Sequence, residues 1–365
     1  MKLGVEAALV GGELELGDIE IVDGVIAGYG ITPAGTGGIA APGFVDLQVN
    51  GFAGVDFLEA DAAGYERAGA ALLETGVTAY LPTLITSPEA RLLDALAAVP
   101  PTGVPGPRIL GVHVEGPFLS PARLGAHPPE WRRDPDLTLA ERLLAAGPVA
   151  LMTVAPELDG AAELITLLRD KGVAVSCGHT DATAAQAHAA FDLGARAATH
   201  LFNAMRPLGH RDPGIVGATL ARDDVVAMVI VDGVHLAPEV VQLVWRAAAG
   251  RVALVTDAIA AAGIGDGTFA LGQVEVEVHD GVATRTEDGV LAGSVVTMIE
   301  AVRNLHALGA PLPRALAAAS SVPARVLGAG RVGRIERGAP ADLVVLDEGL
   351  EITRVLVGGE TLVAA

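Results

Sequence analysis

The sequence has little cysteine, few basic residues and no long apolar run. A single cysteine among 365 residues excludes an intramolecular disulfide framework and a zinc site built from cysteines. Basic residues number 24 against 44 acidic ones, and the formal charge of −20 repels nucleic acid and anionic membranes. No run of 18 apolar residues offers a membrane-spanning helix, and residues 1–10 lack the apolar stretch of a signal peptide. We therefore expect a cytoplasmic protein with no nucleic-acid or membrane partner.

The composition is otherwise that of a protein with a large core. Hydrophobic residues make up 51% of the chain and charged residues 19%, which argues against disorder. The length suits one large domain, or one large and one small domain. The 46 glycines and 22 prolines indicate many tight turns.

The two ends of the chain share a strand-rich pattern. Short apolar runs at 14–16, 19–22 and 25–26 are separated by Gly17-Asp18 and Asp23-Gly24, and Asp-Gly between apolar runs is a hairpin signal. Similar runs follow one another near the C-terminus, at 341–346, 352–357 and 361–363. Neither end has enough strands to be stable alone, so residues 1–41 and 325–365 are predicted to form one small β-sandwich domain.

The middle of the chain alternates between strand-like and helix-like segments. Stretches rich in Ala, Leu, Arg and Glu, such as 65–75 and 161–171, separate apolar runs of strand length. There are eight such runs: 44–49, 77–84, 108–114, 149–155, 173–177, 195–199, 225–231 and 252–256. Continuous apolar strands separated by helices indicate buried parallel strands. We therefore predict an α/β protein in which residues 42–324 form a closed, TIM-like (β/α)8 barrel.

Polar residues stand at the carboxyl ends of several predicted strands, where such barrels carry their catalytic groups. Glu115 follows the third strand, His179 the fifth and His200 the sixth. One carboxylate and two imidazoles suit Zn²⁺ or Fe²⁺, and three protein ligands leave a position open for water. These three residues are therefore the predicted metal ligands.

Asp257 ends the eighth predicted strand, where it would face the same rim. A carboxylate there can take a proton from water activated at the metal and return it to a leaving group. The alternative is a structural Asp257 that accepts hydrogen bonds from loop N–H groups.

Two loops near this rim carry further candidates. Arg211 lies in a Gly/Pro-rich loop, which suits recognition of a phosphate or carboxylate; the alternative is an ion pair with Asp212 or another surface acid. His127 lies in a long loop after the third strand, at 117–135, and either reaches over the pocket or stays solvated. Structural roles are expected for the other histidines and the cysteine that we considered: His188, His279, His306 and Cys177.

At these positions the sequence resembles the N-acetylglucosamine-6-phosphate deacetylase family of the amidohydrolase superfamily. The matching segments occur in the family's order: PGFVDLQVNG (42–51), HVEGPF (113–118), GHTDAT (178–183), THLFNAM (199–205), HRDPG (210–214), DGVH (232–235), VTDA (255–258) and DGVLAGS (288–294). A final segment, RIERGAPADLVVLD (334–347), resembles the superfamily's entry into the C-terminal β domain. Together these motifs extend over nearly the whole chain.

The resemblance implies a role for each matching residue. Glu115, His179 and His200 would bind the metal, Asp257 would act as general base and acid, and His127 would polarise the N-acetyl carbonyl. The phosphate of the sugar would be held by Asn203, Ala204 (through its backbone), Arg211 and His235. Some phosphate contacts in the family come from a second subunit, which implies a homodimer. The expected products are glucosamine 6-phosphate and acetate.

One departure from the superfamily pattern bears on the number of metal ions. Many members carry His-x-His after the first strand, where this chain has Gln48-Val49-Asn50, and amide oxygens are poorer ligands for Zn²⁺ or Fe²⁺ than imidazoles. The bridging lysine of the fourth strand is also missing, since the only lysines are Lys2 and Lys171. We expect one divalent metal per chain, with zinc favoured over iron, manganese or cobalt. Gln48 would then orient the water at that metal.

Two other functions remain open at this stage. One is the hydrolysis of another amide, such as a cyclic amide, which the missing Lys and His-x-His disfavour. The other is a non-catalytic, sugar-phosphate-binding scaffold, but such relatives typically lose ligands that are all present here.

Overall fold

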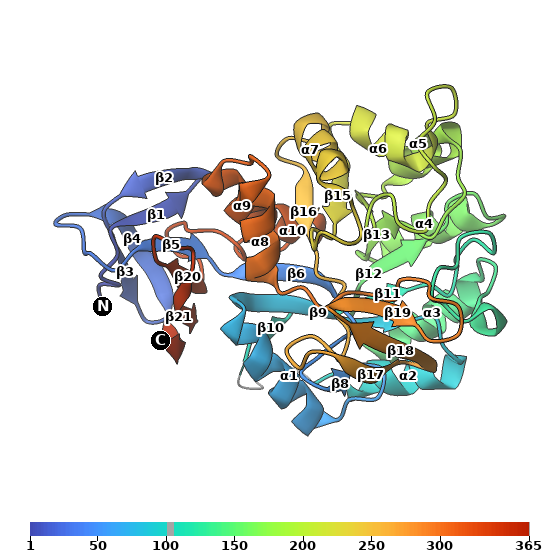
Figure 1. Ribbon diagram of the computed structural model, residues 1–365, viewed down its shortest axis with the longest axis horizontal. Coiled ribbons are helices and arrows are strands. Elements are labelled where there is room, and N and C mark those ends of the chain that lie inside the picture. Colours follow the sequence, from blue (N-terminus) through green and yellow to red (C-terminus); the bar gives the residue numbers. More distant parts are fainter. Residues whose placement is uncertain (101–105, 365) are drawn as a thin grey trace.

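The computed structural model describes residues 1–100 and 106–364; residues 101–105 and Ala365, which belong to the predicted barrel and β domain, lie outside them. Both ends of the chain meet in one β-sandwich, beside the rest of the molecule (Figure 1). Its six-stranded sheet has the order β2 (Glu13–Leu16), β1 (Ala7–Val10), β5 (Ile39–Pro42), β20 (Leu343–Leu346), β21 (Ile352–Val357), β22 (Glu360–Ala364). The hairpin β3 (Asp18–Val22) and β4 (Val25–Ile31) packs against this sheet through a shared apolar core that includes Ile19, Ile26 and Leu343.

The predicted barrel is confirmed. Eight parallel strands follow one another around it: β6 (Phe44–Val49), β9 (Val77–Ile85), β11 (Val112–Glu115), β12 (Val149–Val154), β13 (Ala174–Cys177), β14 (Ala197–Ala198), β15 (Val226–Val229) and β16 (Val252–Leu254). The segment after β16 returns to β6 through a bridge between Val49 and Ala258, and the Asp257 N–H donates to the Gln48 carbonyl at 2.9 Å. The strand ends that carry the candidate residues therefore meet at one rim. The division into domains at 1–41 with 325–365 and 42–324 remains our proposal.

Helices surround the barrel and follow the predicted alternation (Figure 1). They are α1 (Ala62–Glu74), α2 (Glu89–Ala98), α3 (Leu137–Ala146), α4 (Ala161–Asp170), α5 (Ala184–Leu193), α6 (Gly214–Ala221), α7 (Pro238–Ala247), α8 (Met298–Ala307), α9 (Leu312–Ala318), α10 (Ser321–Val326) and the short 3₁₀ helix η1 (Pro129–Trp131). Side chains cap several of them: Asp61 accepts from the Gly64 N–H at the start of α1, and Thr183 and Thr297 form capping boxes on α5 and α8. Within the described part of the chain, every helix is too short or too polar to cross a membrane.

The third predicted strand is divided in two. Residues 108–109 form β10 (Arg108–Ile109) at the edge of β9, and β11 begins after Gly111. Gly111 has φ of +126°, and a Cβ there would come within 2.5 Å of the Ala150 side chain. The chain bends at this glycine because only a residue without a side chain fits so close to β12.

The sequence did not lead us to expect a small sheet after β16. The antiparallel strands β17 (Gly267–Leu271), β18 (Val274–His279) and β19 (Val282–Arg285) bury alternate residues, Val274, Val276 and Val278, in a separate cluster with Ile85 and Ala126. A short ribbon, β7 (Gly51–Phe52) with β8 (Val55–Asp56), follows β6. The small sheet thus covers one side of the barrel's mouth.

Candidate active site

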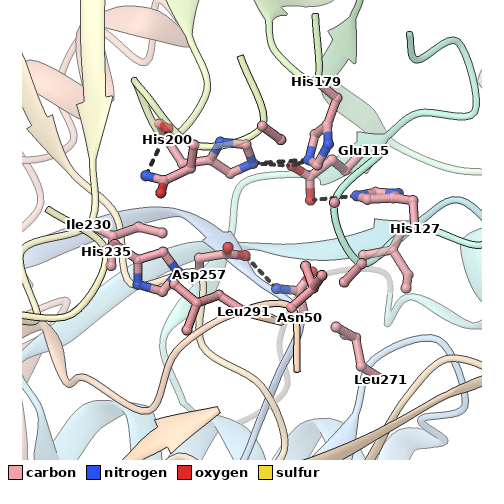
Figure 2. Close-up of a pocket in the computed structure, with 17 residues that line it drawn as sticks. Asn50, Glu115, His127, His179, His200, Ile230, His235, Asp257, Leu271 and Leu291 are labelled. Atoms are coloured by element: carbon pink, nitrogen blue, oxygen red, sulfur yellow. Dashed lines mark hydrogen bonds and ion pairs between the residues drawn. The ribbon is translucent and has the colours of Figure 1, made fainter. Parts of the chain in front are cut away.

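A cavity of about 360 Å³ opens where the barrel strands end. Eight of the predicted site residues line it: Glu115, His127, His179, His200, Asn203, Ala204, His235 and Asp257 (Figure 2). Catalytic groups of such barrels come from this end of the strands. The structure therefore brings together residues that are up to 142 positions apart, from Glu115 to Asp257.

Glu115, His179 and His200 converge on one point. One carboxylate oxygen, Oε1 of Glu115, lies 3.0 Å from His200 Nε2 and 3.3 Å from His179 Nε2, and the two Nε2 atoms are 3.1 Å apart. Burial raises the pKa of Glu115, but the two imidazoles beside it outweigh that effect and hold its pKa below the usual range. A buried, ionised carboxylate facing two ring nitrogens is a donor set that suits a divalent cation.

The backbone around these ligands determines the tautomer and the orientation of the His179 ring. His179 Nδ1 lies 3.0 Å from the Arg123 carbonyl, which can only accept, so Nδ1 carries the proton and Nε2 presents its lone pair. The residue itself has a positive φ of 46°, and His200 has one of 30°. Such conformations are costly for residues with side chains and concentrate at functional sites. Both histidines are thus held in strained positions, with their Nε2 atoms toward Glu115.

His127 is in the opposite tautomer. The backbone N–H of Thr86 donates to His127 Nδ1 at 3.3 Å, so this nitrogen accepts and the proton is on Nε2. Burial, together with the nearby His179, holds the pKa of His127 well below its usual range, so the ring is neutral. Its Nε2 lies 3.8 Å from Glu115 Oε2, at the edge of the metal-ligand set. His127 therefore presents a hydrogen-bond donor to the cavity.

Asp257 lies across the cavity from His127 (Figure 2). Its Oδ1 accepts from the Asn50 side-chain amide at 2.7 Å, and its carbonyl accepts from the Ser294 N–H at 2.9 Å. Burial and the charge of Glu115 raise the pKa of Asp257 to about 6. A carboxyl group with a pKa near neutrality suits a residue that gains and loses a proton during a reaction.

The two amides of the Gln48-Val49-Asn50 segment act as donors. Gln48 Nε2 donates to Glu115 Oε1 at 3.0 Å, as Asn50 does to Asp257. Their oxygens, Gln48 Oε1 and Asn50 Oδ1, are buried without a hydrogen-bond partner in the described residues. Sequence reasoning singled out Gln48 but not Asn50, although Asn50 lies in the matching segment at 42–51. Both amides orient the carboxylates and leave acceptors for a water or a ligand.

The predicted phosphate-binding residues divide into two groups. Asn203, Ala204 and His235 line the cavity, and His235 Nδ1 is held by Asp232 Oδ2 at 2.6 Å. Arg211 is exposed and is not among the lining residues. Asp212, one of the acids considered as an ion-pair partner of Arg211, pairs with Arg206 at 2.7 Å instead.

The apolar wall of the cavity was not predicted. It includes Ile85 at the end of β9, Leu271 from the small sheet, and Val290 and Leu291 after that sheet. No sequence pattern assigned these residues to the cavity, although Val290 and Leu291 lie in the matching segment at 288–294. The segment Asp288–Ser294 had been matched, and its Gly293 is required because a Cβ there would come within 2.7 Å of the Asp257 carbonyl.

The fold and the site define a metal-dependent hydrolase of the barrel type. Residues 39–362 match the amidohydrolase family, and the chain belongs to that family. A rat N-acetylglucosamine-6-phosphate deacetylase is 42% identical over 341 residues, which cover 89% of this chain and 83% of the rat protein. An N-acetylgalactosamine-6-phosphate deacetylase from Escherichia coli O157:H7 is 37% identical and covers 96% of this chain and 95% of its own. Among solved structures, a Mycobacterium smegmatis N-acetyl-D-glucosamine-6-phosphate deacetylase mutant in complex with N-acetyl-D-glucosamine-6-phosphate superposes with a TM-score of 0.94 at 38% identity, over 100% of this chain and 99% of that one.

Proposed function

We propose that this chain removes the acetyl group of N-acetylglucosamine 6-phosphate and releases glucosamine 6-phosphate and acetate. The observation that carries the proposal is the cavity itself, where a carboxylate–imidazole ligand set, a carboxyl group with a raised pKa and a neutral imidazole donor face one another. The 42% identity to a deacetylase of this sugar phosphate supports the choice of substrate. We place the reaction in the cytoplasm.

The metal would be held by Glu115, His179 and His200, and zinc suits the two nitrogen ligands and one oxygen ligand best. The fit is supported by the geometry, since His179 presents a lone pair on Nε2 toward the carboxylate. Gln48 donates to the same carboxylate, and its own side-chain oxygen is buried without a hydrogen-bond partner among the described residues. A bound divalent cation supplies a Lewis acid that polarises the amide carbonyl and makes water a better nucleophile.

The residues of the chain then account for the proton transfers. Asp257 takes a proton from the attacking water and delivers it to the amine nitrogen as the C–N bond breaks. His127 donates its Nε2 proton in a hydrogen bond to the oxygen on which negative charge develops. Asn50 keeps Asp257 in place through its 2.7 Å hydrogen bond, and Gln48 orients the attacking water.

The sugar phosphate would be bound by Asn203, the backbone of Ala204, His235 and Arg211. Because Arg211 is exposed outside the cavity, we propose that it serves the cavity of a second copy of this chain in a homodimer. The overall charge of −20 opposes a dianion at long range, and salt screens that repulsion beyond about 8 Å, so local donors must do the binding.

The direct test is acetate release from N-acetylglucosamine 6-phosphate by metal-loaded protein. N-acetylgalactosamine 6-phosphate, a cyclic amide and unphosphorylated N-acetylglucosamine serve as comparisons. Acetate release that is fastest from N-acetylglucosamine 6-phosphate supports the proposal. Binding of the sugar phosphate without turnover would instead favour a scaffold, and hydrolysis of only the cyclic amide would favour the other enzyme class.

The amide pair at Gln48 and Asn50 leads to a prediction about metal content. Both amides point their NH₂ groups at carboxylates, at 3.0 and 2.7 Å, and so are not arranged as ligands of a second ion. Elemental analysis of metal-saturated protein should therefore give about one tightly bound transition metal per chain. Two ions per chain, both required for activity, would contradict this prediction.

Arg211→Ala should raise KM for the phosphorylated sugar by about 10- to 150-fold, because a hydrogen bond to a charged group contributes about 1.5–3 kcal/mol. Activity on unphosphorylated N-acetylglucosamine should change little, since that sugar makes no phosphate contact. Steady-state kinetics on both sugars measures the difference, with Arg337→Ala, an exposed arginine near β20, as the control. An equal loss on both sugars would make Arg211 a structural residue.

A mixing experiment tests whether Arg211 acts across subunits. Arg211→Ala and Asp257→Asn chains are each impaired alone. In a mixed dimer, the cavity with an intact Asp257 faces a neighbour with an intact Arg211, so activity should return in part. Activity that stays at the level of the parents after subunit exchange would place Arg211 at its own cavity.

A further inference from the structure

A buried histidine that the proposed mechanism does not use lies directly below the metal-ligand set. His113 and Glu115 are two residues apart on β11, so their side chains point to the same side of the strand, into the barrel. His113 is fully buried, in a part of the barrel where branched apolar residues are usual. A polar ring in that position needs partners, and the structure provides them.

The ring of His113 connects neighbouring strands. Its Nδ1 lies 3.1 Å from the Leu47 carbonyl on β6, and its Nε2 lies 2.8 Å from the Thr153 hydroxyl on β12. A carbonyl can only accept, so Nδ1 carries the proton and Nε2 accepts from Thr153. Both ring nitrogens are therefore engaged, and the ring spans β6, β11 and β12.

The connection continues through hydroxyl groups. Thr153 Oγ1 is 2.8 Å from Thr199 Oγ1, and Thr199 Oγ1 is 2.6 Å from Ser176 Oγ. All three side chains are fully buried. We call His113, Thr153, Thr199 and Ser176 the His113 network.

Each end of this network lies next to a residue of the site. Leu47 precedes Gln48, His113 is two residues before Glu115, Thr199 precedes His200, and Ser176 is three residues before His179. The network therefore joins the strands that carry all three candidate ligands. Thr153 also connects β12 to this network, through its hydrogen bond to His113.

From this arrangement we propose that His113 is a positioning residue for the metal centre: its network holds β6, β11, β13 and β14 so that Glu115, His179 and His200 meet at the distance that a cation requires. The proposal rests on the proposed metal site and assigns His113 no contact with the substrate. Hydrogen-bonded groups behind metal ligands typically change metal affinity or activity by about 10- to 100-fold when they are removed.

The sharpest test uses isosteric variants of two buried barrel threonines. Thr153→Val removes the partner of His113 Nε2 and retains the shape of the side chain. Thr78→Val is the matched control, because Thr78 is equally buried but lies near the start of β9, with only a 3.5 Å contact to the Phe44 carbonyl. His113→Phe, which fills the ring's space without its hydrogen bonds, is the second variant.

Zinc is added to the metal-free protein in competition with a chromophoric chelator, which gives the zinc dissociation constant. The thermal unfolding midpoint of the metal-free form is measured alongside. We expect Thr153→Val and His113→Phe to weaken zinc binding by about 10- to 100-fold. Thr78→Val should leave the affinity within about twofold of the wild type, even if its unfolding midpoint falls by as much as that of Thr153→Val.

The proposal is overturned if zinc affinity is unchanged in Thr153→Val and His113→Phe, or if Thr78→Val weakens it equally. If His113→Phe does not fold, Thr153→Val against Thr78→Val decides. Zinc binding is measured without substrate, so a wild-type protein that binds zinc but releases no acetate would refute the proposed function alone.

Discussion

Asp257→Asn should lower kcat by about 10²- to 10⁴-fold, the usual contribution of a general acid–base group, and should leave the metal content unchanged. Asparagine retains the shape of the side chain and can still accept from Asn50, but it cannot take a proton from water or give one to the departing amine. Elemental analysis and steady-state kinetics on the same sample test both parts. Near-normal turnover at unchanged metal content would refute the assignment of Asp257 as the general base.

The pH dependence of activity provides a second test of Asp257 as the general base. Burial and the charge of Glu115 raise the pKa of Asp257 to about 6. Asp257 must be ionised to accept a proton, so activity should be lost as the pH falls through its pKa. A bound cation favours the ionised form, so the acid limb of kcat/KM should lie at or below about pH 6. This limb should be absent from the residual activity of Asp257→Asn, while Asp266→Asn, an exposed control, should retain it.

Glu115→Gln should weaken metal binding by at least about 100-fold, and activity should fall with it. Glu115 supplies the carboxylate of the ligand set. Removal of a hydrogen-bonded group behind a ligand lowers metal affinity by about 10- to 100-fold, and removal of a ligand itself should lower it more. The amide is nearly isosteric and can still accept from Gln48, so the change removes charge more than packing.

Thermal unfolding with and without zinc measures this effect independently of turnover. At a free zinc concentration of 100 times Kd, the wild-type protein should gain about 2.7 kcal/mol of stability. Glu115→Gln should gain little at the same concentration, whereas Glu130→Gln, an exposed residue of η1, should behave as the wild type. A full zinc-dependent gain in Glu115→Gln would place the metal at other residues.

The site was predictable from sequence where it depends on the rim of the barrel. Parallel strands bring their carboxyl ends to one edge, so the polar residues at the end of β11 and in the segments after β13, β14 and β16 had to converge. Glu115, His179, His200 and Asp257 were placed by that rule, and His127 by the loop and the family resemblance. The rule does not say which amide donates to which carboxylate, so the hydrogen bond from Asn50 to Asp257 could be identified only in the structure.

The parts that were not predicted depend on tertiary packing. The middle strand of the small sheet, β18, alternates valine and glutamate, which predicts a strand but not where its buried face packs. Leu271 reaches the cavity because that face rests against Ile85 and Ala126. Arg211 is a different case, since it is exposed and is not among the residues that line the cavity of its own chain, and its proposed role at the cavity of a second chain rests on the family resemblance.

The strained backbone of the rim has a consequence for how this protein tolerates evolution and engineering. Four rim residues have φ between +30° and +51°, a region that glycine adopts with little strain: His179, His200, Ala204 and Asp257. Such conformations cost of order 1–3 kcal/mol each, so the rim holds free energy that the fold could recover by substitution. At His179, His200 and Asp257 a glycine would relieve this backbone strain but remove the reactive side chain and its hydrogen bonds. Selection for heat resistance alone would therefore act against the reactive side chains. Ala204 is the exception among the four, because its proposed contact is made by its backbone and a glycine there would relieve strain without removing a reactive group.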